Sequence, residues 1–238
     1  MLRLPPDPFL VLGHRGASAA APENSVEAFR LAAAQGADGV ELDVRRTADG
    51  SLVVHHDAAV DDGDPIVGLT ERELRRRVPS LVSFHEAMAA CAGLIVNIEI
   101  KNSPAEPDFD SEESVAAAVV DWVQANGWTD RVVVSSFNPA TVDRVRALSS
   151  EIATGQLTLP GADAARELVI AHQRGHQALH PHISSLGRPA ELAAMARGLG
   201  MWVVAWTVDD PAQIMALHDA GITGVITNDP AGARAALA

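Results

Sequence analysis

The chain has 238 residues, of which 47% are hydrophobic, and it carries a formal net charge of −13 at pH 7. This length and apolar content suffice for one sizeable buried core, so we expect a single domain over residues 1–238. The acidic charge repels a phosphate backbone, and no stripe of Lys and Arg with interleaved aromatic residues offsets it, which excludes nucleic acid as an expected partner. No apolar stretch is long enough to span a bilayer, so stable membrane insertion is not expected.

Cys91 is the single cysteine of the sequence, which excludes an internal disulfide and a cysteine zinc cluster. It lies in the apolar run at residues 87–94, and this predicts a position in the core. Residues 1–13 lack the long apolar segment of a secretory signal. We therefore expect a cytoplasmic protein, and the sequence specifies no oligomeric state.

Short β-rich runs alternate with longer Ala-rich segments of helical period, a pattern typical of a parallel sheet with helical crossovers. We predict eight strands, at residues 9–13, 39–44, 94–100, 132–136, 152–157, 178–183, 202–208 and 224–227. The helices predicted between them include residues 25–35, 114–126, 139–148, 162–174, 189–200 and 211–220. This count predicts an α/β fold of the (β/α)8 TIM-barrel type. An open doubly wound sheet is the alternative, but no Gly-rich dinucleotide loop follows the first strand.

One more strand-like run, at residues 52–56, follows the second strand too closely for a helical crossover. Asp49-Gly50 is typical of a two-residue hairpin turn, so we expect a small hairpin insertion after strand 2. A turn centred there places His56 directly opposite Asp43, and such pairs point to the same face of a sheet. The two side chains are therefore expected to converge.

Two charged segments, residues 57–77 and 103–113, are predicted to be long loops beside the barrel mouth. Both loops could shape the entry of a substrate. At the start of the first predicted helix, Asn24 or Ser25 is expected to be the N-cap.

Charged and titratable side chains gather where four apolar strand-like runs end, which is where barrel enzymes build their sites. In the run 97–101 the isoleucines take one face, so Glu99 and Lys101 are expected to point toward the barrel mouth. Buried charges persist only when they are paired with one another or with a metal. The groups that gather at this rim are His14, Arg15, Glu41, Asp43, His55, His56, Asp57, Glu99 and Lys101.

Glu41, Asp43 and Glu99 are the candidate metal ligands among these groups. Their oxygens suit a hard cation better than Zn²⁺, so we predict one divalent cation, Mg²⁺ or Ca²⁺. The alternative is that the three carboxylates only form salt bridges with neighbouring Arg and Lys side chains.

His14 and His56 are the candidate catalytic residues, because two imidazoles beside a phosphate can serve as general base and general acid near neutral pH. Arg15 can bind two phosphate oxygens at once, and Lys101 supplies a point charge. His55 alternates away from His56 and is expected to be structural.

Two aromatic residues are candidates for the substrate pocket. Trp206 ends the seventh predicted strand at the rim, where its indole could line a pocket or belong to the core. Phe137 has the same two interpretations. His180 and His182, at the end of the sixth predicted strand, are additional rim residues.

A series of short motifs runs in one order from near the N-terminus to near the C-terminus. In this ordered set the chain resembles the glycerophosphodiester phosphodiesterase family. The motifs are His14-Arg15-Gly16, Pro22-Glu23-Asn24-Ser25, Glu41-Leu42-Asp43-Val44, Thr47-Ala48-Asp49-Gly50, His56-Asp57, Pro79-Ser80-Leu81, Glu99-Ile100-Lys101, Ser135-Ser136-Phe137, Trp206-Thr207-Val208-Asp209 and Thr227-Asn228-Asp229-Pro230.

The resemblance implies a (β/α)8 barrel in which the three carboxylates hold one Mg²⁺ or Ca²⁺ and His14 and His56 form the catalytic pair. It also implies that Arg15 and Lys101 contact the phosphate. The implied substrate is a small-molecule glycerophosphodiester, which is hydrolysed to glycerol 3-phosphate and an alcohol.

Two other functions stay open at this point. A related barrel phospholipase, of the sphingomyelinase-D or phosphatidylinositol phospholipase C type, shares the histidine pair. Such a lipid enzyme should show a secretory signal, disulfides or an exposed apolar rim, and the first two are missing from this sequence. A non-catalytic ligand-binding barrel would have lost a metal ligand or a histidine, and here none of the proposed groups is lost.

Overall fold

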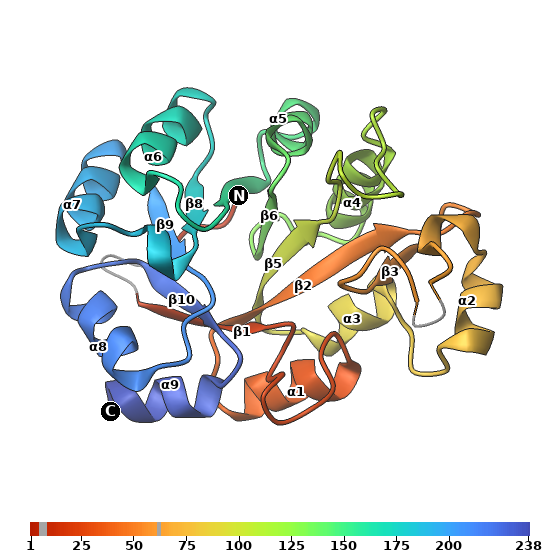
Figure 1. Ribbon diagram of the computed structural model, residues 1–238, viewed down its shortest axis with the longest axis horizontal. Coiled ribbons are helices and arrows are strands. Elements are labelled where there is room, and N and C mark those ends of the chain that lie inside the picture. The colour runs from red at the N-terminus through yellow and green to blue at the C-terminus, as the bar shows by residue number, and fades with distance from the viewer. Residues whose placement is uncertain (5–8, 61–62) are drawn as a thin grey trace.

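The computed structural model describes residues 1–4, 9–60 and 63–238. In this part of the chain, eight parallel strands form a closed ring, because β1 pairs with both β2 and β10 (Figure 1). The TIM barrel is therefore confirmed, and each predicted strand is present. The ring consists of β1 (Leu10–His14), β2 (Gly39–Arg46), β5 (Ile95–Ile100), β6 (Val132–Ser136), β7 (Ala153–Thr158), β8 (Ala178–Pro181), β9 (Trp202–Ala205) and β10 (Gly224–Thr227).

Helices surround the barrel on its outer side (Figure 1). The predicted ones all form, as α1 (Val26–Ala34), α4 (Ser114–Ala125), α5 (Pro139–Leu148), α6 (Ala164–Gln173), α7 (Pro189–Leu199) and α8 (Pro211–Asp219). The structure adds α2 (Glu71–Arg77), α3 (Phe84–Ala90), α9 (Pro230–Leu237) and the short 3-10 helices η1 (Ile66–Gly68) and η2 (Ile183–Ser185). None of the helices in the described ranges has the length and apolar character needed to cross a membrane.

The prediction of one long loop over residues 57–77 is wrong, since η1 and α2 lie within this segment. A capping box starts α2: the Thr70 side chain accepts from the Glu73 backbone, and the Glu73 side chain accepts from the Thr70 backbone. Ser83 and Glu86 start α3 in the same way. These reciprocal bonds satisfy backbone donors at the first turn, which stabilises these two seven-residue helices.

Strand alternation divides β2 between two environments. Val40, Leu42 and Val44 belong to a buried apolar cluster that also contains Cys91, which confirms the core position expected for the cysteine. The intervening Glu41, Asp43 and Arg45 are on the opposite face of the strand, because successive side chains in a strand alternate. The sequence of this one strand thus provides both packing under the helices and charged groups inside the barrel.

The predicted hairpin forms after β2, but its register differs by one residue from the prediction. β3 (Leu52–Val54) pairs antiparallel with β2 so that its last residue lies opposite Val44, and β4 (Val82–Ser83) extends this edge. Gly50 adopts φ +82° and gives a three-residue turn in place of the assumed two-residue turn. The predicted pairing of His56 with Asp43 is therefore wrong, and β3 ends before His56.

Candidate active site

Three carboxylates converge inside the barrel at the carboxyl ends of β2 and β5. Asp43 lies opposite Glu99 in the strand register, and Glu41 precedes Asp43 on the same face. The residues Glu41, Asp43 and Glu99 are only 2%, 1% and 8% exposed. One ligand oxygen from each lies within 4.8 Å of the other two, a spacing that could hold a metal ion.

The electrostatics of this cluster fit a bound cation. Burial and repulsion by Asp43 and Glu99 hold the pKa of Glu41 well above its usual range. Burial and the charge of Asp43 raise the pKa of Glu99 to about 7. Burial also opposes ionisation of Asp43, but Lys101 and Arg15 outweigh it and lower the pKa of that carboxyl. Glu41 Oε1 has no hydrogen-bond partner in the described part of the chain, so this buried oxygen is free to bind a cation.

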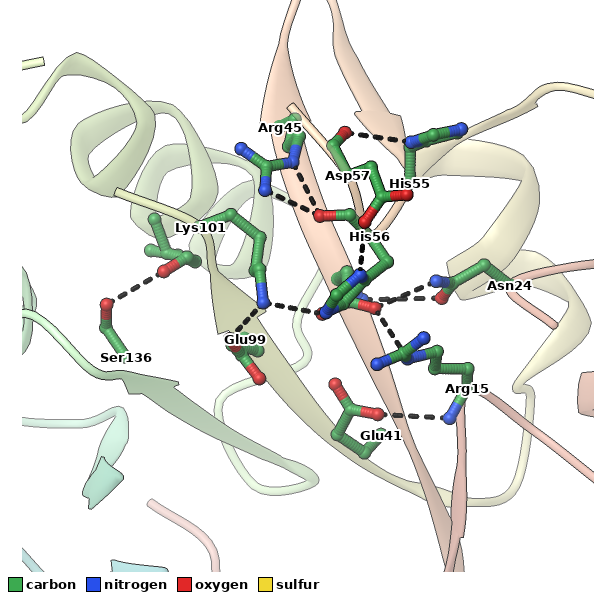
Figure 2. A network of polar contacts seen from close by, with 12 residues as sticks. Arg15, Asn24, Glu41, Arg45, His55, His56, Asp57, Glu99, Lys101 and Ser136 are labelled. Atoms are coloured by element: carbon green, nitrogen blue, oxygen red, sulfur yellow. Dashed lines mark hydrogen bonds and ion pairs between the residues drawn. The ribbon is translucent and has the colours of Figure 1, made fainter. Parts of the chain in front are cut away.

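Arg15 lies against the cluster from the end of β1 (Figure 2). Its backbone N–H donates to Glu41 Oε2 at 3.0 Å, and its Nε is 3.2 Å from Asp43 Oδ2. Its Nη1 donates to both carboxylate oxygens of Glu23, at 2.9 and 3.0 Å. The guanidinium is thus fixed at the mouth of the cluster by acidic groups on two sides.

Lys101 approaches the cluster from the end of β5. Its Nζ is 2.8 Å from Glu99 Oε1 and 3.5 Å from Asp43 Oδ1 (Figure 2). The same ammonium lies 6.0 Å from the centre of the Phe137 ring. Both cations predicted to contact phosphate are therefore at the carboxylates.

Asn24 is a site residue that the sequence analysis assigned only as a possible cap. Ser25 is the N-cap of α1, accepting from the Ala28 N–H, whereas Asn24 Nδ2 donates to Asp43 Oδ2 at 2.9 Å. Asn24 and Arg15 have φ values of 54° and 56°, a conformation that costs energy in residues other than glycine. Such strain often accompanies functional sites, and here it positions two groups on Asp43.

His14 has a defined hydrogen-bonding arrangement at the end of β1. Its Nδ1 is 2.7 Å from Asn228 Oδ1, and the amide orientation is fixed because Asn228 Nδ2 donates to Asp209 Oδ2 at 2.7 Å. Nδ1 must therefore carry the hydrogen, which leaves a lone pair on Nε2, 4.0 Å from Glu41 Oε2. Burial and the Arg15 charge lower the pKa of His14, so the neutral ring can accept a proton.

His56 lies just beyond the end of β3, and its neighbours fix it from two sides. Its Nδ1 is 2.7 Å from Asp57 Oδ1, and its backbone carbonyl accepts bonds from Arg45 Nε and Nη2 at 2.9 and 2.5 Å (Figure 2). His55 turns elsewhere, with Nδ1 2.9 Å from the Asp57 carbonyl. The His55 N–H still donates to the Asp43 carbonyl at 3.1 Å beyond the end of β3, and this bond together with those from Arg45 holds His56 at the site.

Arg45 is a fully buried arginine that connects two segments of the rim. Besides the His56 carbonyl it contacts Glu106 and Asp108, at 3.0 and 2.6 Å from Nη1. Both acids belong to the predicted loop at residues 103–113, which has no helix or strand before α4. The inward alternation of β2 is the sequence signal for Arg45, but its partners are too distant in sequence to be predicted.

The two candidate histidines, both cations and both aromatic residues meet around one cavity of about 120 Å³. Trp206 lies one residue beyond β9, so that strand is shorter than predicted. Its ring centre is 5.4 Å from that of Phe137 and 4.9 Å from that of His182. The cavity is lined by His14, Arg15, Glu41, His56, Asn97, Glu99, Lys101, Phe137, Leu157, Trp206 and Ile226.

Three buried polar side chains lie on three barrel strands, Asn97 on β5, Ser135 on β6 and His180 on β8. Asn97 was not predicted as a site residue, and Ser135 was named only within a family motif. Their side-chain polar atoms, and both ring nitrogens of His180, have no hydrogen-bond partner among the residues that the structure describes. Gly155 makes room for the His180 ring, because a Cβ there would collide with Nε2. Burial lowers the pKa of His180 to about 4, so this ring is neutral.

A closed parallel barrel with carboxylates, cations and histidines at the carboxyl ends of its strands defines an α/β-barrel enzyme of the phosphodiesterase class. The model of the glycerophosphoryl diester phosphodiesterase family matches residues 14–232. The chain therefore belongs to this family.

Named relatives agree with this assignment over nearly the full chain. A glycerophosphodiester phosphodiesterase of Caldanaerobacter subterraneus is 31% identical, over 93% of this chain and 94% of its own. The crystal structure of the Thermotoga maritima glycerophosphodiester phosphodiesterase is 27% identical, with a TM-score of 0.80 over 94% of this chain and 96% of that one. An Oleispira antarctica phosphodiesterase, solved with its product sn-glycerol-3-phosphate, is also 27% identical, with a TM-score of 0.83 over 96% of both chains.

Proposed function

We propose that this protein hydrolyses glycerophosphodiesters to sn-glycerol 3-phosphate and an alcohol, as a single domain over residues 1–238 with one divalent cation. The observation that carries the proposal is the buried cluster of Glu41, Asp43 and Glu99 beside two histidines in one cavity. Family membership supports the reaction, and the Oleispira antarctica relative binds the product that we expect here.

The carboxylates of Glu41, Asp43 and Glu99 would hold the cation. Their donor atoms are all oxygens, which supports Mg²⁺ or Ca²⁺ as the ion. When bound, the cation supplies Lewis-acid stabilisation of charge on the phosphate oxygens. It would also neutralise part of the negative charge of the carboxylates. Arg15 and Lys101 would then be free to bind the phosphate.

His14 is the general base in this proposal. The Asn228 carbonyl oxygen holds the hydrogen on Nδ1, so Nε2 can take the proton of the attacking hydroxyl. That hydroxyl belongs either to water or to the neighbouring glycerol carbon of the substrate. As its oxygen bonds to phosphorus, the bond from phosphorus to the alcohol oxygen breaks. Attack by water gives glycerol 3-phosphate directly, whereas attack by the glycerol hydroxyl gives a cyclic phosphodiester that a water molecule must then open to glycerol 3-phosphate.

His56 is the general acid. Asp57 Oδ1 lies 2.7 Å from Nδ1 and orients the ring, so that Nε2, when it carries a proton, can donate it to the departing alkoxide. Arg45 holds the backbone of His56 and thereby keeps the ring at the rim.

The test is release of sn-glycerol 3-phosphate from a panel of glycerophosphodiesters, first with chelator and then with Mg²⁺ or Ca²⁺ added back. We expect turnover to require the added ion. The double variant His14→Ala/His56→Ala, purified in parallel, controls for contaminating activity. Binding of an ion without turnover of any diester would contradict the proposal and favour a ligand-binding barrel.

A further inference from the structure

A second cavity, which we call the side cavity, opens next to the first. Its volume is about 450 Å³, and it shares Glu99, Lys101 and Phe137 with the cavity that holds the histidines. The remaining walls come from the loop after β5, the start of α5 and the segment after β7. A ligand whose phosphate contacts Lys101 can therefore extend directly into the side cavity.

Apolar side chains form much of the side-cavity wall. Pro104, Phe137, Pro139 and Leu159 line it. Leu159 is 65% exposed, the highest fraction among the exposed large hydrophobic residues in the described ranges. A further hollow of about 360 Å³ shares three of these four residues, so the apolar surface continues outward. Contiguous exposed apolar surface of this kind marks binding sites on soluble proteins.

Most polar side chains of the side cavity are already engaged by the protein. Asn102 Nδ2 donates to the Asp110 carbonyl at 3.0 Å, and its Oδ1 accepts from the Asp110 N–H at 2.8 Å. Ser136 Oγ donates to a backbone carbonyl at 2.8 Å, and Asn138 Nδ2 does so at 3.0 Å. Glu106 accepts from Arg45 through both oxygens. A polyol placed here would lose bonds to water without full replacement, whereas an apolar group would not.

The first cavity is the smaller of the two, at about 120 Å³ against about 450 Å³ for the side cavity. With the phosphate at Lys101, we place the glycerol substituent in the first cavity. The other substituent of the diester must leave it, and the shared residues Glu99, Lys101 and Phe137 mark the path into the side cavity.

We propose that the side cavity binds the alcohol moiety of the diester and selects aliphatic alcohols over polyols. This inference rests on the proposed function, because it places the phosphate at Lys101. Leu159 and Pro104 provide apolar contact in the wall of the side cavity. The glycerol 3-phosphate part stays in the first cavity.

The first experiment compares kcat/KM for diesters of glycerol 3-phosphate with ethanol, butanol, hexanol, glycerol and inositol, with the required cation present. We expect kcat/KM to rise by about twofold or more for each added methylene, because each buried methylene contributes a favourable transfer free energy. The glycerol and inositol diesters should lie below the butanol diester. Equal values across the panel, or higher values for the polyols, would overturn the inference.

The second experiment uses Leu159→Ser, with Met215→Ser on α8 as the matched control at another exposed apolar residue. Leu159→Ser should lower kcat/KM for the hexanol diester by roughly fivefold, since apolar contact is lost, and should lower it less for the glycerol diester, whose alcohol offers less apolar surface. The control should change neither value. An equal loss on both diesters, or no loss, would contradict the inference.

The two proposals fail in distinguishable ways. If no glycerophosphodiester releases glycerol 3-phosphate with either ion, the proposed function is wrong. If the diesters are hydrolysed but show no preference for alkyl alcohols, only the assignment of the side cavity is wrong.

Discussion

Two arcs of the barrel rim differ sharply in character. The charged arc, from β1, β2 and β5, provides His14, Arg15, Glu41, Asp43, Glu99 and Lys101. The neutral arc, from β6 to β9, provides Ser135, Gly155, His180 and Trp206 and carries no paired charge among these residues. Charged groups in the first arc form ion pairs with one another, whereas Ser135 Oγ and both ring nitrogens of His180 in the second are buried without a hydrogen-bond partner among the residues that the structure describes. The comparison teaches that, in one barrel, the strands that carry the candidate cation site can differ from those that form the wall of the substrate cavity.

The largest expected effect is loss of cation binding from the charged arc. Glu41→Gln and Glu99→Gln should each weaken Mg²⁺ or Ca²⁺ binding by more than about 100-fold, since even indirect contacts to a metal are worth about 10- to 100-fold. Titration calorimetry measures this directly. Glu27→Gln, at an exposed residue of α1, is the control. Unchanged affinity in both variants would remove these carboxylates from the ligand set.

The next effect is a loss of kcat that we expect from removal of His14 or His56 but not from removal of the neighbouring His55. His14→Ala and His56→Ala should each lower kcat by roughly 100-fold or more, as expected when a general acid or base is removed. Folding and cation affinity should persist. His55→Ala should retain nearly full activity, because that ring points to the Asp57 carbonyl. A comparable loss in His55→Ala would show that the effect is not specific to the proposed pair.

Substitution of Arg45 tests whether catalysis depends on the bonds that hold the backbone of His56. Arg45→Met leaves Asp108 buried without its cation and should cost about 3–5 kcal/mol of stability. Arg45→Lys keeps the charge but loses the paired bonds to the His56 carbonyl, so kcat should fall about tenfold for lack of orientation. Denaturant titration and steady-state kinetics measure the two effects. Wild-type kcat in Arg45→Lys would show that His56 needs no such support.

The last effect lies in the neutral arc and depends on pH. The pKa of His180 is about 4 in the fold against 6.5 as the ordinary value, so between these values the unfolded chain binds the proton and the native chain does not. Stability therefore falls as the pH drops through this window, by up to about 3 kcal/mol from this group. Urea unfolding at pH 7 and pH 4.5 should show a smaller difference for His180→Leu than for the wild type. Equal differences would mean that the ring is solvated.

The sequence predicted the strands and most of the rim groups because both depend on local alternation. It placed Glu41, Asp43 and Glu99 on inward faces, and the structure agrees. It assigned the hairpin register incorrectly because the conformation of Gly50 decides between two turns that the same residues allow.

Contacts between distant segments could not be predicted from one sequence. The bond from His14 to Asn228 joins β1 to the segment after β10, and the Arg45 contacts join β2 to residues 106 and 108. Each requires the closed barrel before the partners become neighbours. The helices α2 and α3 were missed for another reason, because their charged or short sequences resemble loops until the capping boxes are considered.

The buried guanidinium of Arg45 has a consequence for local unfolding. It bonds at the same time to the carbonyl of His56 and to Glu106 and Asp108. Opening of either rim segment would therefore expose the guanidinium that also holds the other segment. Hydrogen exchange should therefore report one shared opening free energy for the amides of both segments. Arg45→Lys should divide this unit into two, with the amides around residue 56 exchanging first.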